Sequence, residues 1–539
     1  MQKLLLLGDE AIAQAGIDAG MSGVFSYPGT PSTEITEYVR ASSEAREKGV
    51  VASWCANEKT AAETALGMSY AGKRSMTCMK HVGLNVAADV FLNASITGAN
   101  GGLIFVVADD PSMHSSQNEQ DSRVYGDFAM IPVLEPSNQQ EAYDMVYLGF
   151  ELSEKYGVPV MLRITTRLAH SRSGVARKEA RTQNRFRFPE NARQFILLPA
   201  IARKQYAQLL DKQPAFVQES ENSAYNTYMP GQDHSLGIVA CGLAFNYLME
   251  NYPGRKPPHP VVRVCQYPLP HRQLRRLYDE CDRILVIEEG YPVVEQMLKG
   301  FLNTGKPISG RLDGALPRTG ELNPNLVGEA LGIPTGKLAS IPDLVASRPP
   351  SLCKGCSHID SMLDLNEALS GHSSGRVFSD IGCYTLGALP PFGSINTCVD
   401  MGASITMARG AAAAGMDPAV AVIGDSTFTH SGMTGLLDAV NEGSNITVII
   451  LDNATTGMTG GQPSSATGKI EQICRGLGVE EDRIRVINPL KKNHSENTHI
   501  LREELAHKGV SVIIPRRECI QTLNKRMRTK GRDKQRAEK

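Results

Sequence analysis

The 539-residue chain carries 56 Lys and Arg residues against 57 Asp and Glu residues, which gives a formal net charge of −1 at pH 7. A charge this close to neutral excludes a global field that would draw the protein to nucleic acid or to an anionic membrane, and the length exceeds the ~250–300 residues at which one hydrophobic core stops growing. No apolar run approaches the ~20 residues that span a bilayer, and the start MQKLLLLGDE lacks a signal-peptide cleavage site, so we expect a cytoplasmic protein of about three domains.

The first predicted block covers residues 1–175 and alternates short apolar runs with amphipathic stretches. Such alternation is typical of βαβ units and of a mostly parallel sheet. The predicted strands are 23–29, 74–80, 102–110 and 158–164. A polar stretch with helical segments follows, and it is predicted to be a helical linker over residues 176–234.

Two further blocks follow in the sequence. The second, 235–345, has predicted strands at 236–242, 261–267 and 283–290 and ends in a Pro/Gly-rich segment at 305–350. The third, 346–515, has predicted strands at 419–425, 445–453 and 511–515. Residues 516–539 form a basic tail with ten Lys or Arg residues against three Asp or Glu residues, a net charge of +7. We expect this tail to be a disordered terminus or, alternatively, a segment that docks an acidic partner.

The eleven cysteines indicate a reducing compartment, because they are scattered through predicted strands and helices. One pair, Cys353 and Cys356, forms a C-x-x-C ahead of His358. A structural zinc site usually has four ligands, and no second pair lies at metal-ligand spacing, so metal binding is the less favoured interpretation. We expect Cys353, Cys356 and Cys383 to line a ligand pocket as small, polarizable residues rather than as cluster ligands.

The most informative motif runs from Gly424 to Asn453. Gly424, Asp425 and Ser426 follow one predicted strand, and Asp452 and Asn453 follow the next. The 25 residues between Ser426 and Asp452 accommodate one crossover helix, so parallel strands would bring both ends to the carboxyl edge where α/β folds bind ligands. Asp425 and Asn453 offer the oxygen ligands that Mg²⁺ prefers, and Gly424 permits close approach of a phosphate. Asp and Asn could instead be turn residues, but the complete spacing favours a Mg²⁺-diphosphate site.

This segment resembles the thiamine-diphosphate fingerprint, in which Gly-Asp-Gly is followed about two dozen residues later by Asn-Asn. The sequence departs from that pattern at Ser426 and Asp452. The resemblance implies that Mg²⁺ is bound by the side chains of Asp425 and Asn453 and by the backbone carbonyl of Thr455. The residues expected to bind the cofactor are Gly424, Asp425, Ser426, Asn453, Thr455, Gly457, Met458 and Cys383.

A second part of the site is predicted at Glu58, which begins a helix rich in small residues, NEKTAAETALG. Thiamine chemistry needs a carboxyl group against N1′ of the aminopyrimidine, so that the 4′-imino group can take the thiazolium C2 proton. Burial of this carboxyl group would raise its pKa toward neutrality. Glu58 could also be an ordinary dipole-favoured residue of a first helical turn. The segment resembles the catalytic-glutamate segment of thiamine enzymes, which favours the catalytic role.

Longer segments closely resemble the α subunit of indolepyruvate:ferredoxin oxidoreductase, a member of the thiamine-diphosphate-dependent 2-oxoacid:ferredoxin oxidoreductase superfamily. They include SYPGTPSTEI (26–35), MKHVGLNVAAD (79–89), ADDPSMHSSQNEQDSR (108–123) and SDIGCYTLGALPP (379–391), together with CKGCSHID, CVDMGASI and TTGMTGGQPSS. The resemblance extends to about Cys519. It implies an α/β fold with two doubly wound thiamine-diphosphate domains, of pyrimidine type at 1–175 and diphosphate type at 346–515, flanking a transketolase-C-like α/β domain at 235–345.

The same resemblance implies further active-site residues. Thr30 is expected to hydrogen-bond the carboxylate of the oxoacid, although Thr30 and Ser32 could also merely cap a helix. His81 is the first choice for moving protons, ahead of His114 and His358, and each of these could instead be a hydrogen-bonded loop histidine.

The implied reaction is oxidative decarboxylation of an aryl 2-oxoacid such as indolepyruvate to an acyl-CoA, with electrons passed to a ferredoxin-type partner. The resembled subunit ends in a ferredoxin-like domain whose cysteines bind iron–sulfur clusters, whereas this sequence has no cysteine after Cys519. We therefore expect no iron–sulfur cluster in this chain, a β subunit, an external iron–sulfur electron carrier, and a homodimer of αβ units. The alternatives are a non-oxidative decarboxylase that releases an aldehyde and a non-catalytic scaffold subunit.

Overall fold

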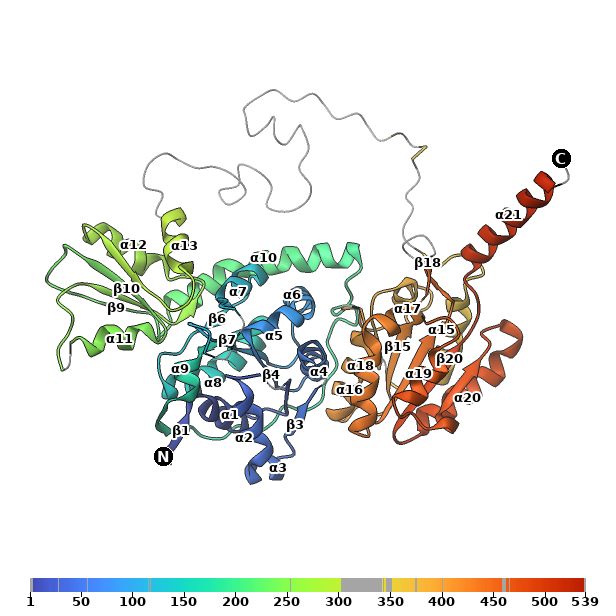
Figure 1. The fold of residues 1–539 in the computed structure, drawn as a ribbon, viewed down its shortest axis with the longest axis horizontal. Helices are drawn as coiled ribbons and strands as arrows, with labels where there is room; N and C mark the ends of the chain where they lie inside the picture. Colours follow the sequence, from blue (N-terminus) through green and yellow to red (C-terminus); the bar gives the residue numbers. More distant parts are fainter. Residues whose placement is uncertain are drawn as a thin grey trace. The chain divides into compact units, whose positions relative to one another are not determined.

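The computed structural model describes residues 3–27, 29–55, 57–114, 116, 118–252, 254–301, 342, 344–345, 351–373, 376–399, 401–457, 462–464 and 466–537 (Figure 1). It divides into two compact units, one of Met1–Tyr291 with Leu352–Lys539 and the other of Pro292–Ser351. The helix α13 (Val293–Phe301) belongs to the second unit. The Pro/Gly-rich segment predicted at 305–350 lies almost entirely outside the described residues. Within the described part of the chain, every helix is too short or too polar to span a membrane.

A seven-stranded sheet dominates the N-terminal block, in the order β12-β6-β7-β5-β4-β2-β3. Its strands are β2 (Gly23–Ser26), β3 (Val51–Trp54), β4 (Ser75–Lys80), β5 (Leu103–Asp109), β6 (Val133–Leu134), β7 (Val160–Thr165) and β12 (Gln266–Tyr267). All neighbours pair in parallel except β12 with β6. The helices of this block include α1 (Gly8–Asp18), α2 (Thr33–Ala41), α4 (Glu58–Tyr70), α5 (His81–Val86), α6 (Ala88–Thr97), α8 (Gln139–Tyr156) and α9 (Thr166–His170). Helix α8 packs on β5 and β7, and α4 packs on β2 and β4, as the alternating pattern predicts.

A four-stranded sheet, β13-β10-β11-β9, forms the second block. Its strands are β9 (Thr227–Met229), β10 (Gly237–Cys241), β11 (Val261–Val264) and β13 (Ile284–Ile287). The prediction of one strand over 261–267 was wrong, because β11 ends at Val264 and β12 joins the seven-stranded sheet instead. Asn226 makes this break: its side-chain oxygen accepts hydrogen bonds from the backbone N–H groups of Cys265 (2.7 Å) and Gln266 (3.0 Å).

The third block is a five-stranded sheet in which all neighbours are parallel, in the order β14-β15-β16-β20-β19. Its strands are β14 (Val377–Ser379), β15 (Ala419–Gly424), β16 (Ile446–Leu451), β19 (Ile484–Ile487) and β20 (Val510–Pro515). Its helices include α15 (Ser357–Ala368), α16 (Ala403–Ala413), α18 (Met433–Asn441), α19 (Ile470–Gly476) and α20 (His494–Ala506). β15 and β16 are completely buried apolar strands, as expected for the interior of a parallel sheet.

The segment that connects the first two blocks is less helical than predicted. Helix α10 runs from Pro199 to Glu221, whereas residues 177–198 lack regular secondary structure apart from a turn and an isolated bridge at Ile196. Cys398 holds them in this form, because its N–H donates to the carbonyl of Phe195 (2.7 Å) and its carbonyl accepts from the N–H of Leu197 (3.1 Å). Pairing with a distant strand-like residue therefore overrides the local helical pattern.

The basic C-terminal segment is also more ordered than a disordered tail. Helix α21 spans Ile520–Ala537. Before it, Arg516 forms ion pairs with Asp452 (2.6 Å) and Glu471 (2.6 Å), and Arg517 forms one with Asp360 (2.7 Å). These first basic residues therefore hold the C-terminal segment against the carboxyl edge of the third sheet.

A buried ionic network joins the first two sheets. Arg163 is fully buried and contacts Asp109 (2.7 Å) and Glu135, and it donates to the backbone carbonyl of Glu289 (3.0 Å). Arg123 pairs with Asp121 (2.6 Å) beside it. Removing one partner from such a network leaves an uncompensated buried charge, which costs about 3–5 kcal/mol. Hydrophobic periodicity gives no sign of this network.

Close packing of α4 against α16 brings the helix of Glu58 onto the third block. A Cβ added at Gly67 would lie 2.6 Å from the Met407 carbonyl oxygen, and one at Gly410 would lie 2.4 Å from that of Thr64. Only glycine allows two backbones to approach this closely. The contact also has polar links, since Thr406 donates to Glu63 (2.7 Å). The small residues of the NEKTAAETALG segment therefore serve helix–helix contact.

Candidate functional site

The two ends of the Gly424–Asn453 motif lie together at one edge of the third sheet. β15 and β16 are neighbouring parallel strands, and Gly424 at the end of one is in register with Leu451 at the end of the other. The crossover consists of α17 (Asp425–Thr427), a π-helical turn (Phe428–Gly432) and α18. The predicted juxtaposition of Asp425 with Asn453 at a carboxyl edge is thus confirmed for the backbone.

A cavity of about 610 Å³ opens at this edge. It is lined by most of the residues predicted to bind a cofactor, together with several from the start of α15 and from the turn after β14. The lining residues are His358, Ile381, Gly382, Cys383, Tyr384, Met401, Gly424, Asp425, Ser426, Thr427, Asn453, Thr455 and Gly457. Met458, also predicted, lies outside the described residues.

Asp425 has the environment of a cation ligand. Its side chain is 2% exposed, and among the described residues its Oδ2 atom has no hydrogen-bond partner. Burial raises the pKa of Asp425 to about 6, which hydrogen bonding by Ser464 only partly offsets. A buried carboxylate oxygen without a donor is costly unless it is protonated or coordinates a metal. The site therefore fits a Mg²⁺ ion that would supply the missing partner.

Asn453 is oriented by its neighbours. Its side-chain amide donates to Nε2 of His358 (3.2 Å), and its Oδ1 accepts the backbone N–H of Thr455 (3.0 Å). Complete burial lowers the pKa of His358 to about 4. The imidazole is therefore neutral at pH 7, and its Nε2 can accept a hydrogen bond from the amide N–H of Asn453. The second lone pair of Oδ1 remains available to a cation. His358 therefore has an orienting role that sequence reasoning left open.

Asp452, where the general fingerprint has Asn, has a different role. Its carboxylate pairs with Arg516 (2.6 Å) and accepts the N–H of Ala454 (3.3 Å). Asp452 therefore ties the motif to the segment after β20. This departure from the fingerprint leaves both predicted side-chain ligands in place.

Tyr384 forms a wall of the cavity that sequence reasoning did not identify. A Cβ at Gly424 would lie 2.6 Å from Cε1 of Tyr384, so this ring can pack there only because residue 424 is glycine. The Tyr384 hydroxyl donates to Asp380, which also accepts from Ser404 (2.7 Å). Since this tyrosine belongs to SDIGCYTLG, the distinctive segment was itself the available signal.

The three predicted catalytic residues of the N-terminal block lie outside the lining of this cavity: Glu58 and His81 begin helices, and Thr30 lies in the loop before α2. Glu58 is the first residue of α4, half-buried, and burial raises its pKa. It faces α5, since a Cβ at Gly83 would lie 2.6 Å from Oε1 of Glu58. Next to it, Lys59 donates to the backbone carbonyl of Met401 (3.0 Å), which does line the cavity. The start of α4 and the cavity are thus linked through adjacent residues.

Thr30 and His81 lie near the carboxyl ends of β2 and β4. Thr30 is exposed in the loop before α2, where the Ser32 hydroxyl donates to the Gly29 carbonyl (2.8 Å). His81 is 1% exposed, and its Nε2 lies 3.2 Å from the Asn118 carbonyl oxygen. Among the described residues its Nδ1 has no partner. His114 is exposed.

Cys383 lines the cavity, and three other cysteines lie near enough to influence its thiol electrostatically. Cys353 and Cys519 both act electrostatically on Cys356 and on Cys383, although more than 160 residues separate Cys353 from Cys519. Burial, followed by the neighbouring Cys356, raises the pKa of Cys383 to about 11. The N–H of Cys519 donates to the carbonyl of Asn453 (3.1 Å), which anchors it at the same sheet edge. Cys353, Cys356 and Cys383 were predicted from the sequence to line one ligand pocket, and the fold adds Cys519 to this group.

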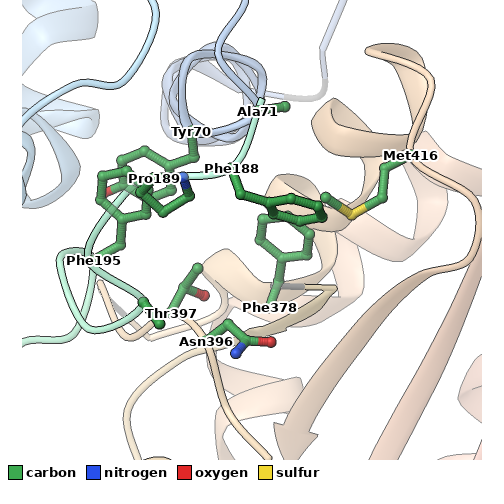
Figure 2. A pocket seen from close by; sticks show the side chains of 10 residues that line it. Tyr70, Ala71, Phe188, Pro189, Phe195, Phe378, Asn396, Thr397 and Met416 are labelled. Carbon is green, nitrogen blue, oxygen red and sulfur yellow. The ribbon is translucent and has the colours of Figure 1, made fainter. Parts of the chain in front are cut away.

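A separate apolar cavity of about 470 Å³ lies near the end of α4 (Figure 2). Figure 2 shows Phe188, from the segment before α10, pointing toward Phe378 of β14. Tyr70 stacks on Phe195 with their ring centroids 3.6 Å apart. The lining contains no carboxylate, histidine or cysteine, so we interpret this space as a packing defect beneath the connecting segment.

Comparisons with known proteins agree with this geometry. Residues 14–229 match the family described as "Pyruvate flavodoxin/ferredoxin oxidoreductase, thiamine diP-bdg", and residues 380–514 match "Thiamine pyrophosphate enzyme, C-terminal TPP binding domain". The chain is 38% identical to indolepyruvate oxidoreductase subunit IorA of Pyrococcus horikoshii, over 96% of this chain and 86% of that one. It is 39% identical to the IorA subunit of Archaeoglobus fulgidus, over 98% of this chain and 89% of that one. The chain belongs to the IorA family.

Membership of the IorA family confirms the resemblance drawn from the sequence motifs, the α/β fold class, and the assignment as a subunit of a thiamine-diphosphate-dependent oxidoreductase. A more distant relative, 2-oxoglutarate synthase subunit KorA of Methanothermobacter thermautotrophicus, is 30% identical over 32% of this chain. The region matched by the first family model includes Glu58. The region matched by the second includes all residues that line the cavity except His358.

Proposed function

We propose that this chain is the catalytic subunit of an indolepyruvate oxidoreductase, which oxidatively decarboxylates an aryl 2-oxoacid to an acyl-CoA. The observation that carries the proposal is a buried Asp425 oxygen, without a hydrogen-bond partner among the described residues, in a cavity at the carboxyl edge of β15 and β16. When bound, thiamine diphosphate supplies a nucleophilic carbon that adds to the keto group and holds the electron pair after CO₂ leaves.

Different residues of the chain would bind the metal, orient its ligands, transfer a proton and contact the substrate. Asp425, Asn453 and the Thr455 carbonyl would hold Mg²⁺ and, through it, the diphosphate. His358 holds the Asn453 amide by a hydrogen bond, and this would orient the Asn453 oxygen as a ligand. Glu58, with its raised pKa, would exchange a proton with N1′ of the aminopyrimidine. Thr30 and His81 are proposed to contact the oxoacid.

The electron outlet is proposed at Cys353, Cys356, Cys383 and Cys519. Four thiols are the usual ligand set of a [4Fe–4S] cluster, and Cys383 also lines the cofactor cavity. A cluster at this position could accept electrons singly and pass them to a ferredoxin-type carrier. This proposal replaces the sequence-based expectation that the chain binds no iron–sulfur cluster. Coenzyme A, a second subunit and assembly as a homodimer of αβ units complete the proposal.

The function is tested by anaerobic dye reduction with the purified chain, thiamine diphosphate and Mg²⁺, with and without the second subunit. Indolepyruvate, phenylpyruvate and pyruvate are compared as substrates. We expect CoA-dependent dye reduction that is fastest with an aryl substrate. Aldehyde formation without dye reduction would instead identify a non-oxidative decarboxylase, and the absence of turnover with every partner supplied would identify a scaffold.

Replacing Cys383 with serine is expected to remove the cluster, because one of its four thiolate ligands is lost. Iron and sulfide in the anaerobically reconstituted chain should fall from about four per chain to near zero, and dye reduction should fall with them. Cys281→Ser is the matched control, since Cys281 is also partly exposed and lies at the end of α12 (His271–Glu280). Equal iron content in wild type and Cys383→Ser would show that these thiols bind no cluster.

A further inference from the structure

Three potential metal ligands meet at a place that the proposed reaction does not use. They are Asp9 at the start of α1, Glu34 in the first turn of α2, and His170 at the end of α9. One ligand atom from each residue lies within 4.8 Å of the other two. Nε2 of His170 and Oε1 of Glu34 are 3.6 Å apart. The three helices follow different strands, so only the tertiary structure assembles this group.

Asp9 makes this group more than a cluster of acidic residues. Its side chain is completely buried, and within the described residues neither carboxylate oxygen has a hydrogen-bond partner. Oε2 of Glu34 is likewise buried and without a partner there. Burial, and then the nearby Glu34 carboxylate, raise the pKa of Asp9 well above its usual range. Counted over the described residues, three buried carboxylate oxygens thus lack a donor at one place, which is costly for a folded protein.

The backbone around Asp9 is tightly constrained. A Cβ at Gly8 would lie 2.3 Å from the carbonyl oxygen of Leu168, so α1 and α9 are in backbone contact. This contact fixes the separation between Asp9 and His170. A site built in this way is pre-formed, which lowers the entropic cost of binding an ion.

We propose that Asp9, Glu34 and His170 bind a divalent transition-metal ion. Two carboxylates with one imidazole are a donor set typical of Zn²⁺ or Mn²⁺ sites that keep open positions for water. With metal–ligand bonds of about 2.1 Å, tetrahedral ligand atoms lie about 3.4 Å apart, and the atoms here lie within 4.8 Å of one another, so side-chain rotation would have to bring them closer when the ion binds. Glu34 and His170 are about one-third exposed, which provides a path for the ion.

The ion would connect three helices beneath the loop that carries Thr30. Glu34 follows this loop by four residues, and the other two ligands belong to helices that pack on each other. A metal there would fix the start of α2 and hence the end of the loop. The competing explanation is a single proton shared between Asp9 and Glu34, which would leave other buried oxygens unsatisfied.

The test is metal binding by the full chain after treatment with a chelator and return of thiamine diphosphate and Mg²⁺. Zn²⁺ and Mn²⁺ are added separately, and bound metal is counted after equilibrium dialysis. Wild type is compared with Asp9→Asn and His170→Gln, and with Glu37→Gln as control, because Glu37 is an exposed carboxylate on the same helix as Glu34. We expect both ligand variants to bind one equivalent per chain less than wild type and Glu37→Gln. Metal that binds at the cysteines or replaces Mg²⁺ should be the same in every variant, so it cancels when the amounts of bound metal are compared.

Thermal unfolding separates a lost site from a lost fold. Asp9→Asn keeps the shape of the side chain and removes the buried charge, so without metal it should unfold at a temperature at least as high as wild type. Added Zn²⁺ or Mn²⁺ should raise the midpoint of wild type and leave that of Asp9→Asn unchanged. Equal metal content in wild type, Asp9→Asn and His170→Gln would overturn the proposal and favour the shared proton. That outcome would be independent of the 2-oxoacid activity.

Discussion

Asp425→Asn is expected to abolish tight binding of thiamine diphosphate. The asparagine would keep the shape of the side chain and one oxygen, but it would lose the charge that neutralises Mg²⁺ in a buried site. Loss of residues that merely support a metal ligand costs about 10–100-fold in affinity, so removal of a ligand charge should weaken the cofactor by about 100-fold or more. The measurement is Mg²⁺-dependent binding of thiamine diphosphate by calorimetry, together with 2-oxoacid-dependent dye reduction.

Two features sharpen this test. Asp417→Asn is a matched control, because Asp417 precedes the opposite, amino end of the same strand β15 and pairs with Lys508 on the surface. It should bind the cofactor as wild type does. In addition, Asp425→Asn removes a buried carboxylate oxygen that has no partner in the part of the chain the structure describes, so the cofactor-free variant should be no less stable than cofactor-free wild type in urea unfolding. Retention of wild-type affinity would show that Asp425 is not the metal ligand.

The second large effect is expected from Glu58→Gln, which should abolish turnover while leaving the cofactor bound. Glutamine can still hydrogen-bond to N1′ of the aminopyrimidine, but it cannot transfer a proton. General acid–base catalysis contributes about 10²–10⁴-fold, so kcat should fall by that factor. Deuterium exchange at C2 of the bound cofactor should slow to a similar degree, and this is the more direct measurement because it does not depend on substrate or electron acceptor.

Glu63→Gln is the control on the same helix. Glu63 contacts Lys59 and accepts a hydrogen bond from Thr406 at the interface between α4 and α16. Its replacement should lower stability modestly and leave C2 exchange unchanged. If Glu58→Gln and Glu63→Gln slowed exchange equally, the effect would come from the position of α4 rather than from a proton carried by Glu58.

The sequence was sufficient for features that depend on neighbouring residues or on a fixed periodicity. Buried apolar runs such as 419–424 and 446–451 predict parallel strands, and the spacing from Asp425 to Asn453 predicts their shared carboxyl edge. Both follow from local geometry, because a strand ends where its apolar run ends and one crossover helix returns the chain to the same edge. The long motifs similarly identify the family, since each can be matched without knowledge of the fold.

Only the tertiary structure decided which distant residues meet. The sequence grouped Cys353, Cys356 and Cys383 at one pocket, whereas only the fold adds Cys519, which is more than 130 residues away from Cys383. Asp9, Glu34 and His170 have no common motif, and three separate helices bring them together. A distant partner also changed the end of a predicted strand: Asn226 accepts hydrogen bonds from the backbone after Val264, and the strand predicted over 261–267 ends there. The physical reason is the same in each case: these contacts join chain segments far apart in sequence, and their strength depends on burial and charge that arise only when the chain is packed.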